Sequence, residues 1–358
     1  MRSTSPTTDL AKLALTVGIL PPLRLRQYSP TSDLPALESI CSEVYGGGDY
    51  LPAMAARMAA DESNTLLVLT ADVGDAPVSI ANLKRLSPTV AWLEAVRTAT
   101  EWRGAGLASR LCSALAALAA TEGRRVFSAT VESNAAMLRS FARCSFEPVG
   151  TIHLISWSAL KALPGWASGG TAEPQSLLRA LGLEAAHVTP AVRARAARFE
   201  RLRDTDDLRR ALASTADGVG GSGCMPGLYK LLGDEALEAA LAEGGAFWQH
   251  SSPACIVALT SDESVSSLRS QVVCSICLDG RAEGVESDEE RAADVDATVA
   301  AALWRASEEH GHRPFCLAID GAVPATPGGL LAALPLNADR CVLHGAQIGR
   351  GEGGGTTT

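Results

Sequence analysis

The sequence predicts an α/β protein in which a mixed, mostly antiparallel sheet carries helices on both faces, followed by a second, similar lobe. Three observations predict this fold. Apolar residues over positions 22–158 alternate between strand and helix periodicities, and a glycine turn at 103–106 joins a strand directly to an apolar helix. Residues 198–209 then repeat the opening of the first region, a strand followed by a capped helix. We therefore expect one fold, used twice.

The composition is that of a globular protein long enough for two domains. The chain has 358 residues, 47% of them apolar and 20% charged. A net charge of −9 argues against nucleic acid as the main partner, because phosphate binding needs a basic face. No apolar run reaches the roughly 20 residues of a membrane span. The nine scattered cysteines favour reduced thiols in a cytoplasmic protein, and the CxxC pair Cys274 and Cys277 fits a strand core better than a metal site.

The first region is predicted as a strand, two helices, three strands, a helix, a strand, a helix and a final strand or strand pair. Helical segments carry apolar residues three and four positions apart, whereas strand segments are short and rich in β-branched residues. The predicted strands are residues 23–27, 65–71, 76–83, 90–98, 126–131 and 146–157, and the predicted helices are 32–44, a short one ending near 61, 107–120 and 134–143.

The stretch between the predicted strand 90–98 and the long helix 107–120 predicts an anion site. A helix that follows a glycine turn leaves its first N–H groups unpaired at the positive end of its dipole, and glycine lets a pyrophosphate come close. No third glycine or Gly-Lys-Ser/Thr follows, which argues against a Rossmann site and a P-loop. The pattern Arg-x-x-Gly-x-Ala resembles the acetyl-CoA loop of the GCN5-related N-acetyltransferase superfamily. That resemblance implies the fold, acetyl-CoA as co-substrate without a metal, and binding by Arg103, Gly104, Ala105, Gly106, Leu107 and Ala108.

Two further segments narrow the resemblance. Residues 45–52 (Tyr-Gly-Gly-Gly-Asp-Tyr-Leu-Pro) and 94–98 (Glu-Ala-Val-Arg-Thr) resemble the histidine N-acetyltransferase (N-acetyltransferase 16-like) branch, most closely over 41–110. This implies acetyl transfer to the amino group of a small acceptor, an amino acid with L-histidine as the first candidate. Two alternatives stay open: a peptide or protein N-acetyltransferase, and a non-catalytic acetyl-CoA-binding regulator.

Glu94 is the candidate catalytic residue. It is a carboxylate in an otherwise apolar strand, where burial would make it a better base for an amine, acting directly or through water. An ion pair with Arg97 or another strand charge is the alternative interpretation. The transfer would be a direct attack in a ternary complex. The resemblance implies that the backbone at Val96 and Thr98 holds the pantetheine arm and that one strand N–H polarises the thioester carbonyl.

The candidate substrate-binding residues lie in the segment 45–52 and in the strand after Glu94. Tyr45 and Tyr50 would line the rim of the acceptor pocket, with Tyr50 stacking on a ring. Asp49 would pair with an ammonium or imidazole group, or instead cap the next helix. Arg97 would hold an α-carboxylate, or instead be an exposed strand charge. Asn134 would contact the cofactor or substrate, or instead cap its own helix.

Phe141 departs from the superfamily pattern. It stands seven residues after Asn134, where the superfamily often has a tyrosine that protonates the leaving thiolate. A phenyl ring has no proton to give, which leaves water, Ser140, Tyr45 or Tyr50 as the proton source.

We expect five regions along the chain: a flexible leader (1–21), the N-acetyltransferase domain (22–158), a linker with a short helix (159–197), a degenerate acetyltransferase-like lobe (198–348) and a disordered tail (349–358). In the second lobe, acidic residues stand where the first has its phosphate loop. They suit a helix start but repel a pyrophosphate, so one active site per chain is expected. These residues are Glu283, Glu286, Asp288, Glu289 and Glu290.

Overall fold

The computed structural model describes residues 10–19, 23–71, 75–155, 189–214, 224–227, 230–242, 246–251, 254–261, 272–278, 287–310, 315–320 and 339–346. They form two compact units. The first holds the described residues up to Ser128, Asn134–Pro148 and the described residues from His344 onward; the second holds Ala129–Ser133 and the described residues from Val149 to Leu343. Among the described helices, none is long and apolar enough to cross a bilayer.

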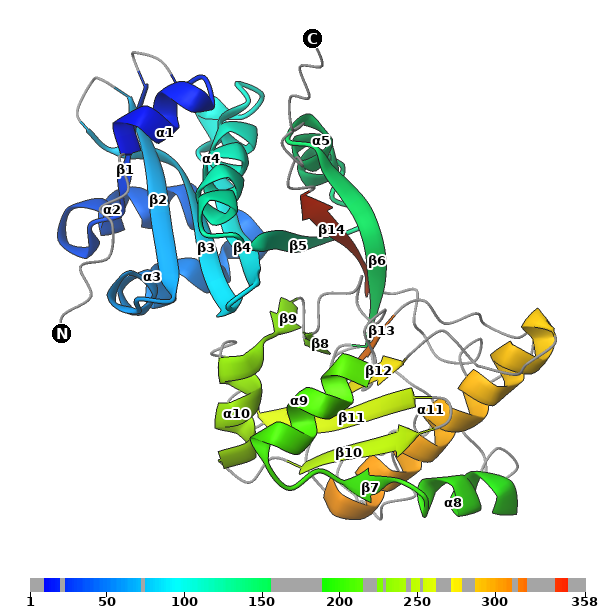
Figure 1. The fold of residues 1–358 in the computed structure, drawn as a ribbon. Coiled ribbons are helices and arrows are strands. Elements are labelled where there is room, and N and C mark those ends of the chain that lie inside the picture. Colours follow the sequence, from blue (N-terminus) through cyan, green and yellow to red (C-terminus); the bar gives the residue numbers. More distant parts are fainter. Residues whose placement is uncertain are drawn as a thin grey trace, which may run out of the picture. The chain divides into compact units, whose positions relative to one another are not determined.

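A five-stranded arrangement forms the centre of the first unit (Figure 1). Strands β1 to β4 pair antiparallel in chain order, and β5 joins β4 in parallel. A parallel neighbour requires a crossover connection, which helix α4 supplies. These elements are β1 (Leu23–Gln27), β2 (Asn64–Ala71), β3 (Pro77–Ser87), β4 (Val90–Thr98), α4 (Leu107–Thr121) and β5 (Arg125–Val131).

Helices cover both faces of this sheet. Leu67 packs in the core beneath α1 (Leu10–Thr16), α4 and α5 (Ala135–Arg143), whereas its neighbour Leu66 packs beneath α2 (Pro30–Cys41) and α3 (Leu51–Ala60). Successive strand residues point to opposite faces, so an apolar strand can fill both cores at once. The mixed, mostly antiparallel sheet with helices on both faces is thereby confirmed. Two 3-10 turns, η1 (Val44–Gly47) and η2 (Thr100–Trp102), complete the unit.

Residues 10–19 correct the expectation of a flexible leader over 1–21. They contain α1, and Leu13 and Ile19 are buried in the core that α4 also covers. Arg110 of α4 donates a hydrogen bond from Nη1 to the carbonyl oxygen of Gly18 at 2.9 Å. The segment is too short to carry a clear helical signal. Its apolar residues become a buried stripe only once α4 is in place.

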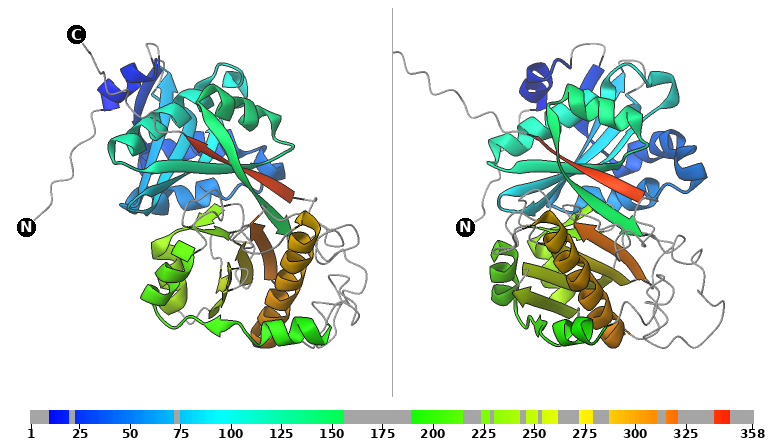
Figure 2. Two further views of the ribbon diagram at one scale, coloured as in Figure 1. Left: turned by 45° about the vertical axis from the view of Figure 1, so that its right-hand side comes forward. Right: turned by 90° about the vertical axis from the view of Figure 1, so that its right-hand side faces the viewer.

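The second unit repeats the element order of the first. Strand β7 is followed by two helices, an antiparallel meander of three strands, the long helix α11 and a strand parallel to the last strand of the meander. Figure 2 shows α11 running beside the strands. The matching elements are β7 (Glu200–Arg201), α9 (Thr205–Ser214), α10 (Asp234–Ala242), β10 (Ala246–Ser251), β11 (Ala254–Ser261), β12 (Val272–Leu278), α11 (Asp288–His310) and β13 (Phe315–Asp320). This order and pairing support the expected second lobe.

Three elements of the second unit lack a counterpart in the first: α8 (Pro190–Ala196) and the hairpin of β8 (Met225–Gly227) and β9 (Lys230–Leu232). Cys274 and Cys277 are buried in β12, as expected of core residues. Ser287 caps α11 by accepting from the N–H of Glu290 at 3.2 Å, so the helix starts at its acidic residues. Most of the expected linker and the whole expected tail lie outside the described residues.

Neither unit is a single continuous stretch of the chain. Residues Val149–Ile155 of β6 (Phe146–Ile155) belong to the second unit, where Ile152–Ile155 pair antiparallel with β13. The end of β14 (Asp339–Ala346) belongs to the first unit, where the His344 and Phe141 rings lie 4.8 Å apart between centroids. Phe141 is 1% exposed and also stacks on Phe146. A core of the first unit therefore depends on residues near the end of the chain.

A chain shortened to end at residue 158 is expected to lose cooperative unfolding or to melt well below the full-length protein. It lacks His344 and Ala346, which pack against Phe141 and the α4 core. Exposing aromatic surface of this kind costs about 1.5–3 kcal/mol per side chain. Thermal unfolding by circular dichroism measures the effect, and a chain ending at residue 346 is the matched control. Equal melting temperatures for the chains ending at 158 and 346 would contradict the expectation.

Candidate active site

Strands β4 and β5 separate within the first unit. Their pairing runs only from Val90 to Trp92 on β4, against Arg125–Phe127. At the point of separation, the hydroxyl of Ser128 donates to the carbonyl oxygen of Leu93 at 2.8 Å. Beyond it, β4 continues to Thr98 without pairing to β5. The open edge contains Val96 and Thr98, the two positions predicted to hold a pantetheine arm through the backbone.

The predicted anion loop leads from this edge into α4. Gly104 and Gly106 have φ angles of 86° and 77°, in the left-handed region that glycine adopts without strain. Gly106 is the N-cap of α4, and its helix start has neither a side-chain cap nor an acidic residue in the first turn. The N–H groups of Leu107 and Ala108 therefore lie at the positive end of a long helix. This geometry suits a pyrophosphate, as the sequence predicts.

A bulge in β4 brings the predicted base and the predicted arginine to one face of the sheet. Residues three apart in a regular strand point to opposite faces. The pairing of β4 with β3 shifts by one residue between Glu94 and Arg97, and Ala95 has a φ of 57°, which a non-glycine residue seldom adopts. Ala95 packs with the α2 and α3 core, whereas Val96 packs with the α4 core. No signal in the sequence marks this bulge.

Asp49 and Arg97 form a buried ion pair. Arg97 donates from Nε to Oδ2 of Asp49 at 2.7 Å and from Nη2 to Oδ1 at 3.2 Å. The Asp49 side chain is 1% exposed and also accepts from the N–H of Leu51 at 3.1 Å. These three bonds use most of the roughly four acceptor sites of a carboxylate. The predicted alternative, in which Asp49 caps the next helix, fits this geometry.

The ionisation of the pair follows from its surroundings. Burial alone would raise the pKa of Asp49, but the hydrogen bonds and charge of Arg97, together with the N–H of Leu51, outweigh burial and hold that pKa below its usual value. Burial alone would lower the pKa of Arg97, yet Asp49 holds it above its usual value. Both groups are therefore charged and committed to each other. Asp49 is therefore engaged by Arg97 rather than left for an ammonium or imidazole group.

Two tyrosines flank the guanidinium group of Arg97. Its central carbon lies 5.5 Å from the ring centroid of Tyr45 and 5.9 Å from that of Tyr50, within cation–π range. Tyr45 is 73% exposed and has a left-handed φ of 52°, whereas Tyr50 is half-buried. Burial raises the pKa of the Tyr50 hydroxyl, and the charge of Glu94 raises it further. Glu94, Arg97, Tyr45, Asp49 and Tyr50 are thus brought together as predicted.

The two remaining predictions concern α5. The side chain of Asn134 accepts a hydrogen bond from the N–H of Met137 at 3.1 Å, so it caps the helix, which was the alternative interpretation. Phe141 lies in the core against Phe146 and His344, away from solvent. Its replacement of tyrosine therefore has a packing reason.

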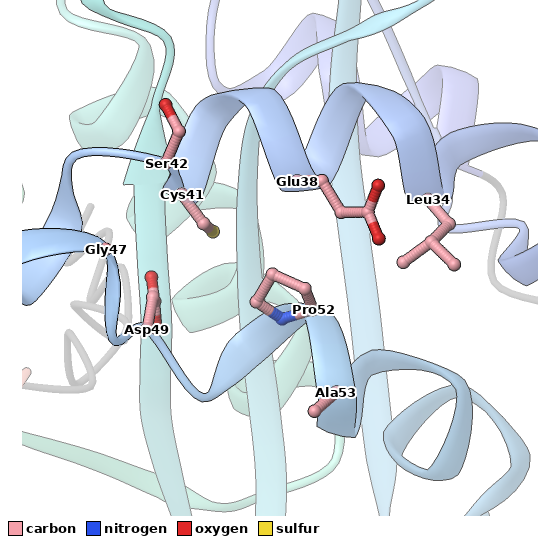
Figure 3. A pocket seen from close by; sticks show the side chains of 8 residues that line it. All are labelled: Leu34, Glu38, Cys41, Ser42, Gly47, Asp49, Pro52 and Ala53. Atoms are coloured by element: carbon pink, nitrogen blue, oxygen red, sulfur yellow. The ribbon is translucent and has the colours of Figure 1, made fainter.

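A pocket of about 530 Å³ lies between α2 and α3. Figure 3 shows its lining, in which α2 faces the loop before α3 and the first residues of that helix. Asp49 connects the pocket with Arg97, and Glu38 is the exposed carboxylate on the α2 side. Burial raises the pKa of the Cys41 thiol to about 12, so this group lines the pocket as a neutral thiol. The lining residues are Leu34, Glu38, Cys41, Ser42, Gly47, Asp49, Pro52 and Ala53.

Sequence reasoning missed Glu38 and Asn82. Glu38 looks like an ordinary exposed helix residue, and only the position of α3 places it at a pocket. Asn82 interrupts the apolar run of β3 and is fully buried, with Nδ2 donating to Oε1 of Glu94 at 3.0 Å. A polar residue inside an apolar strand was a usable signal. Its partner depended on the strand register, which the sequence does not specify.

The match to known families agrees with this geometry. Residues 34–146 match the Acetyltransferase (GNAT) family. The matched residues are similar to acetyltransferases of this family, and the match indicates an N-acetyltransferase. The family uses acetyl-CoA as its co-substrate.

The solved structures to which the chain is similar include the following acetyltransferases. A GCN5-related N-acetyltransferase from Kribbella flavida shares 14% identity with a TM-score of 0.43, covering 91% of this chain and 72% of that one. A mutant spermidine N-acetyltransferase SpeG from Vibrio cholerae shares 17% identity with a TM-score of 0.31, over 36% and 82% of the two chains. Ard1 from Thermoplasma volcanium shares 19% identity with a TM-score of 0.32, over 41% and 90%. No curated protein sequence matches the chain.

Proposed function

We propose that the first unit transfers the acetyl group of acetyl-CoA to the amino group of a small acceptor, with L-histidine as the leading candidate. The observation that carries this proposal is the β4 bulge. It presents Glu94 and Arg97 on the face that also holds Tyr50 and the pocket between α2 and α3. The same strand has its open edge next to the glycine loop. The acceptor can therefore approach β4 from the face that α2 and α3 cover, and acetyl-CoA can approach it at its open edge.

Each step of the transfer has a proposed group in this chain. Glu94 takes the proton of the amine, directly or through water, as the new C–N bond forms and the C–S bond breaks. The backbone at Val96 and Thr98 holds the arm of the co-substrate, and residues 103–108 hold its pyrophosphate. Phe141 has no proton to give, and water is proposed to protonate the departing thiolate.

Arg97 is proposed to recognise the acceptor without giving up Asp49. Of its five N–H donors, Nε and Nη2 each serve Asp49 and Nη1 serves the carbonyl of Val96. One N–H on each terminal nitrogen is left for an α-carboxylate, in the bidentate manner arginine favours. Tyr45 stands exposed beside it, where it can stack on an imidazole ring. Glu38 would attract a cationic acceptor to the pocket.

A thiol-release assay with acetyl-CoA tests the proposal. The acceptors are L-histidine, the other free amino acids, spermidine and short peptides with free N-termini. The highest kcat/KM is expected for L-histidine, and N-acetylation is identified by mass spectrometry of the product. Turnover of peptides alone would replace the proposed acceptor by a protein N-terminus. Binding of acetyl-CoA without turnover of any acceptor would favour the non-catalytic regulator. That alternative fits Phe141, which has no proton to give to a leaving thiolate.

Replacing Gly106 with alanine is expected to raise KM for acetyl-CoA about tenfold, because the helix start must change where the pyrophosphate would bind. Gly123→Ala is the matched control. Gly123 follows the other end of α4 with a φ of 70°, and an added Cβ meets nothing at either position. Both changes should cost about 1–2 kcal/mol of stability, since both strain a left-handed residue. Equal KM values for the two variants would contradict the assignment of the loop.

A further inference from the structure

Asn82 lies opposite Glu94 in the pairing of β3 with β4. Its amide nitrogen donates both of its hydrogens: one to Oε1 of Glu94 at 3.0 Å and one to Oδ1 of Asn64 at 2.7 Å. The side chain is completely buried. An amide with two donor bonds in different directions cannot turn without breaking both. Asn82 therefore holds one oxygen of the Glu94 carboxylate at a defined place.

The far end of this connection is anchored at the end of α3. Asn64 donates from Nδ2 to Oδ2 of Asp61 at 2.7 Å. Oδ1 of Asp61 accepts from the N–H of Ser63 at 2.9 Å, and the N–H of Asp61 itself bonds to the carbonyl of Met58. The chain of hydrogen bonds thus runs from Glu94 through two amides to a carboxylate fixed by the backbone. Such networks limit the motion of every member.

Fold stability does not explain the choice of asparagine here. Within the described residues, Oδ1 of Asn82 is buried and accepts no hydrogen bond. A buried acceptor without a donor costs stability, so the acceptor side of this amide does not explain the residue. What Asn82 supplies at this position is the pair of N–H donors that bind Glu94 and Asn64.

We propose that Asn82 is a positioning residue for the reaction, which holds the carboxylate of Glu94 in its ionised form and in one orientation toward the acceptor amine. This proposal rests on the proposed function, in which Glu94 is the base. A donor hydrogen bond favours the charged form of a carboxylate, and loss of that bond favours the protonated form. A fixed carboxylate also keeps its basic oxygen at the distance that proton transfer needs.

The first measurement follows the ionisation of the Glu94 carboxylate independently of catalysis. The carboxyl carbons of all glutamates are labelled with ¹³C, and the Glu94 signal is identified by its loss in Glu94→Gln. Titration of that signal gives the pH midpoint at which Glu94 takes up a proton. In Asn82→Leu the midpoint is expected to rise by about one pH unit, because the donor is lost. In Asn82→Asp it should rise further, because two carboxylates then face each other.

Kinetics with acetyl-CoA and L-histidine as the acceptor probe supply the second readout. The acid limb of the pH–rate profile should move with the midpoint, and kcat should fall about tenfold while KM for acetyl-CoA stays unchanged. Thr70→Val is the control, because Thr70 is equally buried on β2 but bonds to Asp75. Should Asn82→Leu fail to fold, Asn64→Leu loosens the same amide from its far side, with a smaller shift in the same direction.

The outcomes distinguish the two proposals. An unchanged midpoint in the folded Asn82 variants, or the same change in Thr70→Val, overturns the role of Asn82 whatever the activity. A raised midpoint together with full activity of Glu94→Gln instead overturns Glu94 as the base and with it the catalytic meaning of Asn82. A raised midpoint, a shifted acid limb and an inactive Glu94→Gln support both.

Discussion

Replacing Glu94 with glutamine is expected to lower kcat/KM for amine acetylation by about 10²- to 10⁴-fold, the usual contribution of a positioned base. Glutamine has the same shape and can keep an oxygen facing the Asn82 amide, but it cannot accept the proton of the amine. The affinity for acetyl-CoA should not change, because the glycine loop and the start of α4 are untouched. Thiol release measures the rate, and calorimetry with acetyl-CoA measures binding.

Glu101→Gln is the matched control for this experiment. Glu101 is exposed on η2, between β4 and the glycine loop, and no role is proposed for it. It should behave as the wild type. A Glu94→Gln protein within twofold of the control in kcat/KM would remove Glu94 from the mechanism. In the alternative interpretation, a pairing of Glu94 with Arg97 would share that guanidinium with Asp49.

Replacing Asp49 with alanine is expected to destabilise the protein by about 3–5 kcal/mol, because it leaves the guanidinium of Arg97 buried and uncompensated. The side chains of Asp49 and Arg97 are 1% and 13% exposed, so solvent screens the pair little. The double replacement with Arg97→Ala should recover part of the loss, since it removes the orphaned charge. Urea unfolding of the single and double variants measures the coupling.

The pH dependence of this loss follows from the pKa of Asp49. That pKa is lowered in the folded protein by Arg97, so the pair stabilises the fold fully above the unfolded value of about 3.9. Its contribution is lost as the pH falls through the lower, folded value. The difference between wild type and Asp49→Ala should thus hold from neutral pH down to about 4 and shrink below it. Glu238→Ala is the control, because its ion pair with Arg209 is exposed and should contribute at most about 1 kcal/mol.

Local patterns were sufficient for most of the first unit. Strands β1 and β4 have the predicted bounds, because each is an uninterrupted run between turn residues. α4 ends one residue later than predicted, since glycine at 123 stops it. The helix after Pro30 starts earlier than predicted, because proline suits the first turn of a helix. The repeat of this order in the second unit was also visible from its opening strand and helix.

Long-range pairing explains what the sequence could not predict. The apolar residues of the helix Leu10–Thr16 become a buried face only by packing in the core that α4 also covers. Part of β6 belongs to the second unit and the end of β14 to the first, which their places in the chain do not suggest. Within the site, the shift of register at Ala95 decides that Glu94 and Arg97 share a face. An alanine carries no mark of such a bulge. The pairing of Arg97 with Asp49 joins residues 48 positions apart and likewise has no local signal.

Local sequence patterns were enough to predict the class of the protein and a glycine loop suited to its co-substrate. Both depend on short segments, the glycine turn at 104–106 and the helix after it, where local backbone preferences set the geometry. Only the tertiary structure decided which charges are available to an acceptor. Asp49 pairs with Arg97, and Asn82 donates to Glu94. Glu38 lies at the pocket. The reason is physical: an ion pair or a buried hydrogen bond depends on which groups meet across strands and helices, and that is set by register and packing.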